Sequence, residues 1–129
     1  MAILPITSLF AAAFAVALVA LSFPISLQRL KVGDMVGDST DDGLRRRIRA
    51  QGNFIEYVPI GVVTLGLVEA QGAAVWIVVT IGTLLAVGRI LHAVGMYSAS
   101  GSVRGFGMVL TYLSMLIAAG LLFADTMIF

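Results

Sequence analysis

Three polar residues follow a helical spacing inside an otherwise apolar part of the chain. Arg49, Asn53 and Glu56 are separated by steps of four and three residues, which place them on one face of a helix. We call this face the polar stripe. It starts in a basic run and continues into an apolar one, so it leads toward a membrane interior. A carboxylate in lipid is costly and requires a partner, and the stripe therefore predicts a functional site.

The other apolar segments supply polar residues that should reach the same level. Arginine binds carboxylates through paired hydrogen bonds, which strengthen in a partly dry site. We expect a cationic cleft that suits a small anionic ligand carrying an amine, held by Glu56 or Asn53. A hydrophobic co-substrate would arrive from the bilayer. The further candidates are Arg29, Arg46, Tyr57, Arg89, His92, Tyr97 and Arg104.

The composition is typical of an integral membrane protein. Hydrophobic residues make up 60% of the 129 residues and charged residues 12%. Soluble domains average about 45–50% apolar and about 25% charged residues. The absence of cysteine excludes disulfides and thiolate metal sites, and a single histidine does not favour a metal site. We expect neither a metal nor a nucleic acid as a partner.

Four apolar segments predict an all-α membrane four-helix bundle that forms a single domain over residues 1–129, at roughly 20 residues per span. The first segment is not expected to be a signal peptide, because its first basic residue, Arg29, follows the apolar run. The predicted spans are about 3–27, 44–67, 73–96 and 104–127. The glycines expected to let helices approach closely are Gly61, Gly66, Gly82 and Gly88.

Several residues predict where helices begin and end. Pro24 is expected to kink or end the first helix, and the polar run 28–43 is expected to form a loop. Asp41 or Asp42 is expected to cap the second helix. Residues 69–72 are expected to form a tight turn between the second and third spans.

The basic residues predict the orientation in the membrane. All eight Lys and Arg residues fall near the first-to-second or the third-to-fourth connection. Cytoplasmic loops carry such an excess, so this end is expected to be cytoplasmic, with both termini on the opposite side. The cations are Arg29, Lys31, Arg45, Arg46, Arg47, Arg49, Arg89 and Arg104.

Each candidate also has a structural interpretation. The triplet Arg45–Arg47 can anchor the chain to anionic lipid. Glu56 can pair with a neighbouring arginine, and Arg89 can brace helices, without any ligand. His92 can be a packed histidine, and Tyr97 can belong to the aromatic belt at the membrane interface.

The polar stripe lies in a segment that resembles a family signature. RIRAQGNFIEYVPI resembles the motif of the membrane-associated proteins in eicosanoid and glutathione metabolism (MAPEG). That family includes microsomal glutathione transferases, leukotriene C synthase and microsomal prostaglandin E synthase. The length, the four spans and the cationic end also fit, so the resemblance covers nearly the whole chain. The matching residues are Arg49, Ala50, Asn53, Glu56 and Pro59.

The resemblance implies a homotrimer that binds glutathione as a co-substrate between neighbouring subunits. An arginine opening the fourth span is the family's candidate for stabilising the glutathione thiolate, and Arg104 takes this place. A free thiol has a pKa near about 8.5, and an adjacent guanidinium favours its anion. The expected glutathione-binding residues are Arg49, Asn53, Glu56, Tyr57, Gln51, Arg29, His92 and Tyr97.

Two features depart from the family pattern. Several members have tyrosines late in the third span that touch glutathione, and here the nearest positions hold His92 and Met96. Tyr97 is displaced by one residue, and the loop before Arg104 is slightly longer than the pattern requires. The short form resembles bacterial members, which implies the inner membrane of a bacterium.

Besides a structural or assembly role in the membrane, three functions remain. The favoured hypothesis is a glutathione transferase or peroxidase that acts on lipophilic electrophiles and detoxifies them. The alternative is a protein of the same fold that binds glutathione or another anion without turnover. A small multidrug exporter is a third alternative, but such exporters need a glutamate in the first span, and residues 3–27 contain no acid.

Overall fold

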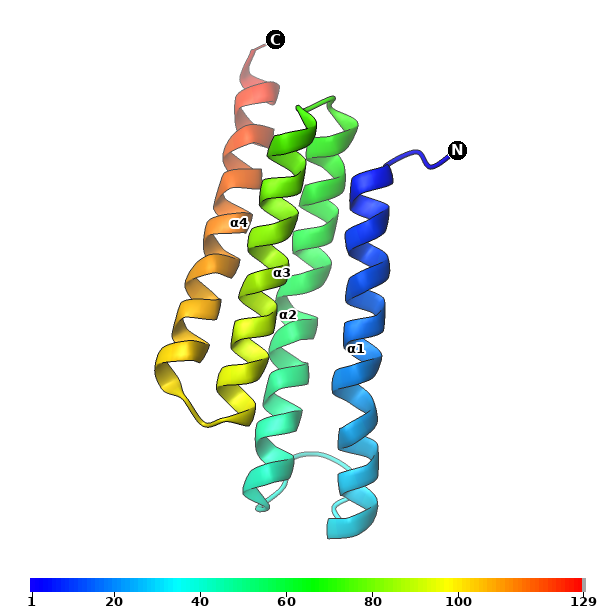
Figure 1. Ribbon diagram of the computed structural model, residues 1–129, viewed down its shortest axis with the longest axis vertical. Coiled ribbons are helices and arrows are strands. Elements are labelled where there is room, and N and C mark those ends of the chain that lie inside the picture. The colour runs from blue at the N-terminus through cyan, green and yellow to red at the C-terminus, as the bar shows by residue number, and fades with distance from the viewer. Residues whose placement is uncertain (129) are drawn as a thin grey trace.

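The computed structural model describes residues 1–128 and contains four long helices. They are α1 (Pro5–Val32), α2 (Asp42–Ala70), α3 (Val75–Tyr97) and α4 (Gly101–Met127). Each is long and apolar enough to cross a membrane, and no strand occurs among residues 1–128. Both termini and the α2–α3 turn lie at one end, and the other two connections lie at the opposite end (Figure 1). The predicted all-α membrane bundle is confirmed.

Helix α1 is longer than expected. It begins with Pro5 at its first position, where the missing N–H costs no hydrogen bond. It does not end near Pro24 but continues to Gly33, whose left-handed φ of 89° terminates it. The predicted loop is therefore wrong over residues 28–32. A proline removes one backbone hydrogen bond, and Ile25 directly after it is buried and keeps this turn packed.

Helix α2 is fastened differently at its two ends. At its start, the Asp41 carboxylate accepts a hydrogen bond from the Leu44 N–H at 2.8 Å, so Asp41 is the predicted cap. At its end, the helix extends through Glu69, a residue predicted to lie in the turn. The Glu69 carboxylate accepts hydrogen bonds from the N–H groups of Ile6 at 2.9 Å and Thr7 at 2.7 Å. Because α1 has no side-chain cap of its own, Glu69 satisfies its exposed N-terminal donors.

Glycines allow α3 and α4 to pack closely. A Cβ atom at Gly88 would collide with the backbone of Gly107, and one at Gly95 would collide with the backbone of Arg104. Small residues permit such approach between membrane helices, as predicted for Gly88. The contact holds the start of α4, and with it Arg104, against the last turns of α3. The α4 helix begins at Gly101, earlier than the predicted start near residue 104, because Ser100 caps it by accepting from the Val103 N–H at 3.4 Å.

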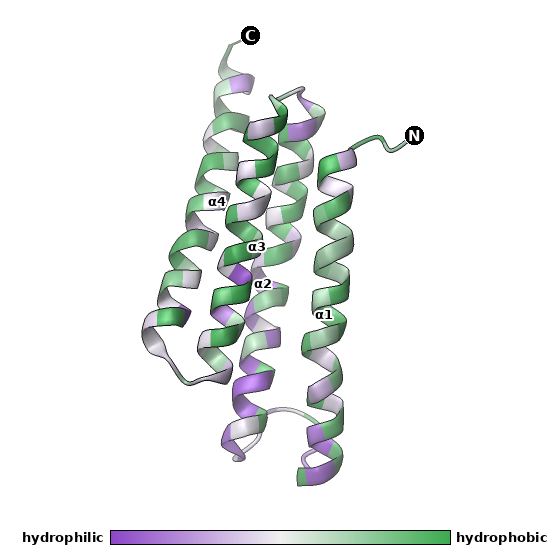
Figure 2. Cartoon of the chain, in the orientation of Figure 1, coloured by the Kyte–Doolittle hydropathy of each residue, from purple (hydrophilic) through white to green (hydrophobic). Residues whose placement is uncertain are grey.

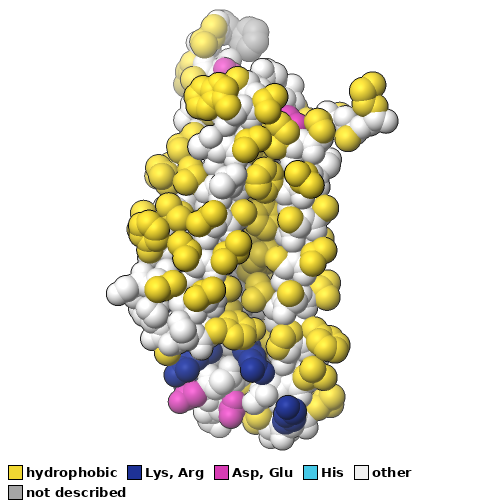
Figure 3. Space-filling view, viewed as in Figure 1, with side chains coloured by type: hydrophobic (Ala, Val, Ile, Leu, Met, Phe, Trp, Pro, Cys, Tyr) yellow, Lys and Arg dark blue, Asp and Glu magenta, His cyan; other side chains and the backbone are white. Residues whose placement is uncertain are grey.

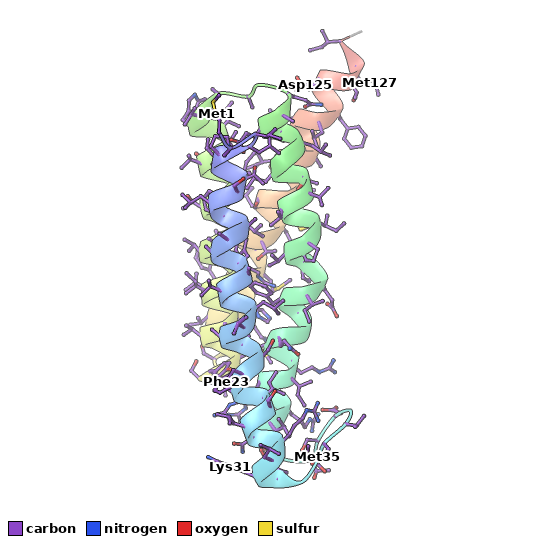
Figure 4. The ribbon with its side chains drawn as sticks, turned by 90° about the vertical axis from the view of Figure 1, so that its right-hand side faces the viewer. Met1, Phe23, Lys31, Met35, Asp125 and Met127 are labelled. Atoms are coloured by element: carbon purple, nitrogen blue, oxygen red, sulfur yellow. The ribbon has the colours of Figure 1, made fainter. Side chains whose placement is uncertain are left out.

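Polar residues concentrate at one end of the bundle (Figure 2). We call the end with the α1–α2 and α3–α4 connections the basic end, and the other the terminal end. Figure 3 shows a largely hydrophobic face whose Lys and Arg side chains gather at the basic end. Lys31 and Met35 lie at this end, and Met1 and Asp125 lie at the other (Figure 4). Many large apolar side chains along the helices are exposed, which suits contact with lipid or with neighbouring subunits.

Candidate functional site

A cleft with a volume of 370 Å³ lies near the basic end, between α2, α3 and α4. All three members of the polar stripe line it, so the helical spacing brings them to one surface as predicted. Helix α3 contributes His92, and α4 contributes Arg104, which the close packing at Gly95 holds near α3. We call this site the α2–α4 cleft. Its lining residues are Ile48, Arg49, Gly52, Asn53, Glu56, His92, Met96 and Arg104.

The charged groups on the cleft walls have almost no partners within residues 1–128. Arg49, Glu56 and Arg104 are exposed. Within residues 1–128, Arg49 and Glu56 form no side-chain hydrogen bond or ion pair, and Arg104 reaches only the Met96 sulfur at 3.8 Å. The structural interpretation that pairs Glu56 with an arginine therefore does not hold inside the described chain. Two guanidiniums and one carboxylate remain available to a ligand.

Arg89 lies behind the cleft and braces three helices. Its side chain is only 4% exposed, and its guanidinium lies over the Tyr57 ring at 5.7 Å. Nη1 donates to the Asn53 side-chain oxygen at 2.6 Å and to the Asn53 carbonyl at 3.2 Å, and Nη2 contacts the Met108 sulfur at 3.3 Å. No carboxylate accepts from Arg89 within residues 1–128. The bracing interpretation of Arg89 is thus the one that the geometry supports.

A second hollow extends the cleft toward the α3–α4 connection. It has a volume of 220 Å³ and shares Met96 and Arg104 with the α2–α4 cleft. Arg46 reaches it from the first turns of α2. Arg104 therefore borders both spaces.

Sequence comparison agrees with the motif. The sequence profile of the MAPEG family matches residues 7–124. The chain belongs to the MAPEG family. It is 31% identical over 112 residues, covering 87% of this chain and 86% of the other, to the inner membrane protein YecN of Escherichia coli K12. The protein of the same name from Escherichia coli O6:H1 is equally similar. No solved structure matches the chain significantly. With its four apolar helices, this MAPEG member is an integral inner-membrane protein.

Two of the glutathione-binding residues expected from the MAPEG resemblance are engaged in local contacts. Arg29 donates to the carbonyls of Asp34 at 2.8 Å and Gly37 at 2.7 Å and thereby holds the α1–α2 connection. Gln51 donates to the Ser22 hydroxyl at 2.8 Å and ties α2 to α1. Gln51 is two residues from either neighbour on the polar stripe, and a helix directs such a residue to another face. Neither residue lines the α2–α4 cleft.

The two tyrosines of the expected set also lie outside the cleft lining. The Tyr57 hydroxyl lies 3.4 Å from that of Tyr112 on α4. Tyr97 is exposed, and the Arg47 guanidinium lies 5.9 Å from its ring centre. His92, by contrast, is buried at 5% exposure yet lines the cleft, and its ring forms no hydrogen bond within residues 1–128. The imidazole nitrogens are therefore available to form hydrogen bonds with a ligand.

Proposed function

We propose that this MAPEG protein is a glutathione-dependent membrane enzyme that conjugates lipophilic electrophiles or reduces them. The observation that carries the proposal is the gathering of Arg49, Asn53, Glu56 and Arg104 around one cleft. Glutathione has carboxylates, an ammonium group and a thiol, so two guanidiniums and a carboxylate match its charges. The 370 Å³ of the cleft lies within the usual range of small-ligand sites, about 300–1,000 Å³.

In this mechanism Arg104 stabilises the glutathione thiolate. The guanidinium favours the charged form of a thiol whose free pKa is near about 8.5, and the thiolate is the nucleophile. Its sulfur attacks the electrophilic carbon, forms the carbon–sulfur bond and displaces the leaving group, while the thiol proton passes to water. With a hydroperoxide, the thiolate sulfur attacks the outer oxygen and breaks the O–O bond, which releases the alcohol and leaves a sulfenic acid. The thiol of a second glutathione then forms the disulfide with this sulfur and releases water.

The assembly and orientation are part of the same proposal. The exposed apolar helix faces suit a homotrimer in which a neighbouring subunit closes the open side of each cleft. The excess of Lys and Arg at the basic end supports a cytoplasmic position for the cleft, with both termini on the other side. Glutathione would enter from the cytoplasm, and the electrophile would enter sideways from the lipid.

The direct test is turnover by the purified protein in detergent, with glutathione and chlorodinitrobenzene. We expect Arg104→Ala to lower the rate at pH 7 by about tenfold or more, because a neighbouring cation lowers a pKa by about 1–3 units. The deficit should shrink above about pH 9, where the thiol ionises without help. Arg45→Ala is the matched control, since Arg45 is exposed and lies in the first turn of α2, outside the cleft. A rate that Arg104→Ala leaves unchanged would remove Arg104 from the mechanism.

A second candidate is a protein that binds glutathione without efficient turnover. The cleft favours it in one respect, because His92 and Met96 occupy positions where the resemblance expects tyrosines. This candidate predicts that glutathione raises the unfolding temperature while no conjugate or oxidised glutathione forms. Cross-linking tests the assembly in either case, and a monomer would contradict the trimer.

A further inference from the structure

The contact between Arg89 and Asn53 determines which atoms the Asn53 amide turns to each side. Arginine carries donors only, so the Asn53 atom 2.6 Å from Arg89 Nη1 must be the carbonyl oxygen of the side chain. The same nitrogen lies 3.2 Å from the Asn53 backbone carbonyl. Two acceptors of one residue therefore converge on one guanidinium, which leaves the amide little freedom to rotate by half a turn.

The opposite edge of the Asn53 amide is available to the cleft. Its nitrogen donates to no residue within 1–128. This atom is not fully buried, and Asn53 lines the cleft. An amide nitrogen has two hydrogens to donate and cannot accept. At this point of the wall, the cleft therefore offers donors alone.

We infer that Arg89 is a positioning residue that fixes Asn53 as a donor, so that this part of the cleft selects an acceptor oxygen of the ligand and refuses an ammonium group. The identity of the ligand rests on the proposed function. The acceptor is a carboxylate or an amide carbonyl, and the ligand ammonium is left to Glu56, the acid on the cleft wall. This narrows the sequence prediction, which allowed Asn53 to hold an amine.

The buried charge strengthens this arrangement. Arg89 is 4% exposed, its Nε has no hydrogen-bond partner, and no carboxylate neutralises it within residues 1–128. A cation bound to the amide oxygen polarises the amide and makes its N–H groups better donors. Arg49 and Arg104 on the cleft walls add to the preference for a negative group.

The deciding variant is Asn53→Asp, because it moves stability and binding in opposite directions. The new carboxylate gives the buried Arg89 a counterion, so we expect the unfolding temperature to rise or stay level. It also replaces the donor edge by an acceptor, so glutathione affinity, measured by isothermal titration, should fall by about 10- to 100-fold. Unchanged or tighter binding of glutathione would overturn the inference, because an amine at this position would gain from the added charge.

A matched pair at residue 89 tests the positioning role. Arg89→Lys keeps a donor at the end of a side chain of nearly the same length, whereas Arg89→Met keeps similar volume without one. We expect the lysine variant to bind glutathione within about threefold of the wild-type affinity, and the methionine variant to lose about tenfold. Equal affinities of the two variants would overturn the role of Arg89.

The same titrations separate this inference from the proposed function. Sulfate serves as an anionic probe that only accepts hydrogen bonds, and methylammonium serves as a cationic probe that only donates them. Wild-type protein that binds sulfate more tightly than Asn53→Asp does, but does not bind glutathione, would contradict the proposed function and support the inference. Wild-type protein that binds neither, or that prefers methylammonium, would overturn the inference itself.

Discussion

Two glutamates of α2 are in opposite chemical situations. The Glu69 carboxylate, at the terminal end, accepts from two backbone N–H groups of α1 at 2.9 and 2.7 Å. The Glu56 carboxylate, on the cleft wall, is exposed and accepts from no group within residues 1–128. A polar group in a membrane bundle must find a partner. Glu69 finds its partner inside the fold, whereas Glu56 has none within residues 1–128.

The arginines repeat this contrast. Arg89 is buried and directs its donors to Asn53 and Met108, so its charge is used to hold helices and orient an amide. Arg104 is exposed and has only the long contact to the Met96 sulfur. Burial with fixed partners marks a positioning group, and exposure on a cleft wall marks a binding group. Positioning groups and binding groups can therefore be separated by experiment.

The largest effect on this contrast should come from Gly95→Ala, which disturbs the wall that carries Arg104. A Cβ at this position collides with the Arg104 backbone, so we expect a loss of about 1–3 kcal/mol in the free energy of unfolding together with lower turnover. Gly105→Ala is the control, because its Cβ would have nothing within 4 Å. Thermal unfolding and turnover are measured for both variants. Equal stability of Gly95→Ala and Gly105→Ala would contradict the close α3–α4 packing.

The next effect should be on binding alone. Glu56→Gln removes a charge that has no partner in the described chain, so the unfolding temperature should not change. Glutathione affinity should fall about tenfold, or about 1.4 kcal/mol, because the ligand ammonium loses its carboxylate. Titration calorimetry measures the change. A stability loss without an affinity change would show that Glu56 serves the fold after all.

The smallest effect should be on stability alone. Glu69→Gln weakens the cap of α1 and should lower the free energy of unfolding by about 1 kcal/mol. Glutathione affinity should stay at the wild-type value, because Glu69 lies at the terminal end of α2. If this variant impaired binding as much as Glu56→Gln does, the division between the two glutamates would be lost.

Much of the candidate site follows from local rules. Residues at steps of three and four share a helix face in any helix, so the polar stripe could be assigned to one cleft before its neighbours were known. The resemblance assigned Gln51 to the glutathione site, but the same rule places it on another face, where its amide donates to Ser22 on α1. The cap at Asp41 depends on contacts within one turn, and it too was predictable.

Contacts that depend on loop conformation or on helix packing were not predictable in this way. Arg29 was assigned to the ligand site because it reaches the right depth, but the loop carbonyls of Asp34 and Gly37 compete for its donors. Depth alone does not show which acceptor an arginine meets. The helix continuing past Pro24 is a similar case, since the packing of Ile25 outweighs one missing hydrogen bond.

Amino-acid order alone is sufficient for the membrane location, the four helices and the stripe of Arg49, Asn53 and Glu56, because these depend on hydropathy and on spacing along one helix. Which charges are satisfied inside the bundle depends on helix packing. The Glu69 cap of α1 joins residues that are 62 and 63 positions apart. The hydrogen bond between Arg89 and Asn53 joins residues that are 36 positions apart. Only the packed helices bring such groups within hydrogen-bond distance, and that packing leaves Glu56 and Arg104 open to a ligand.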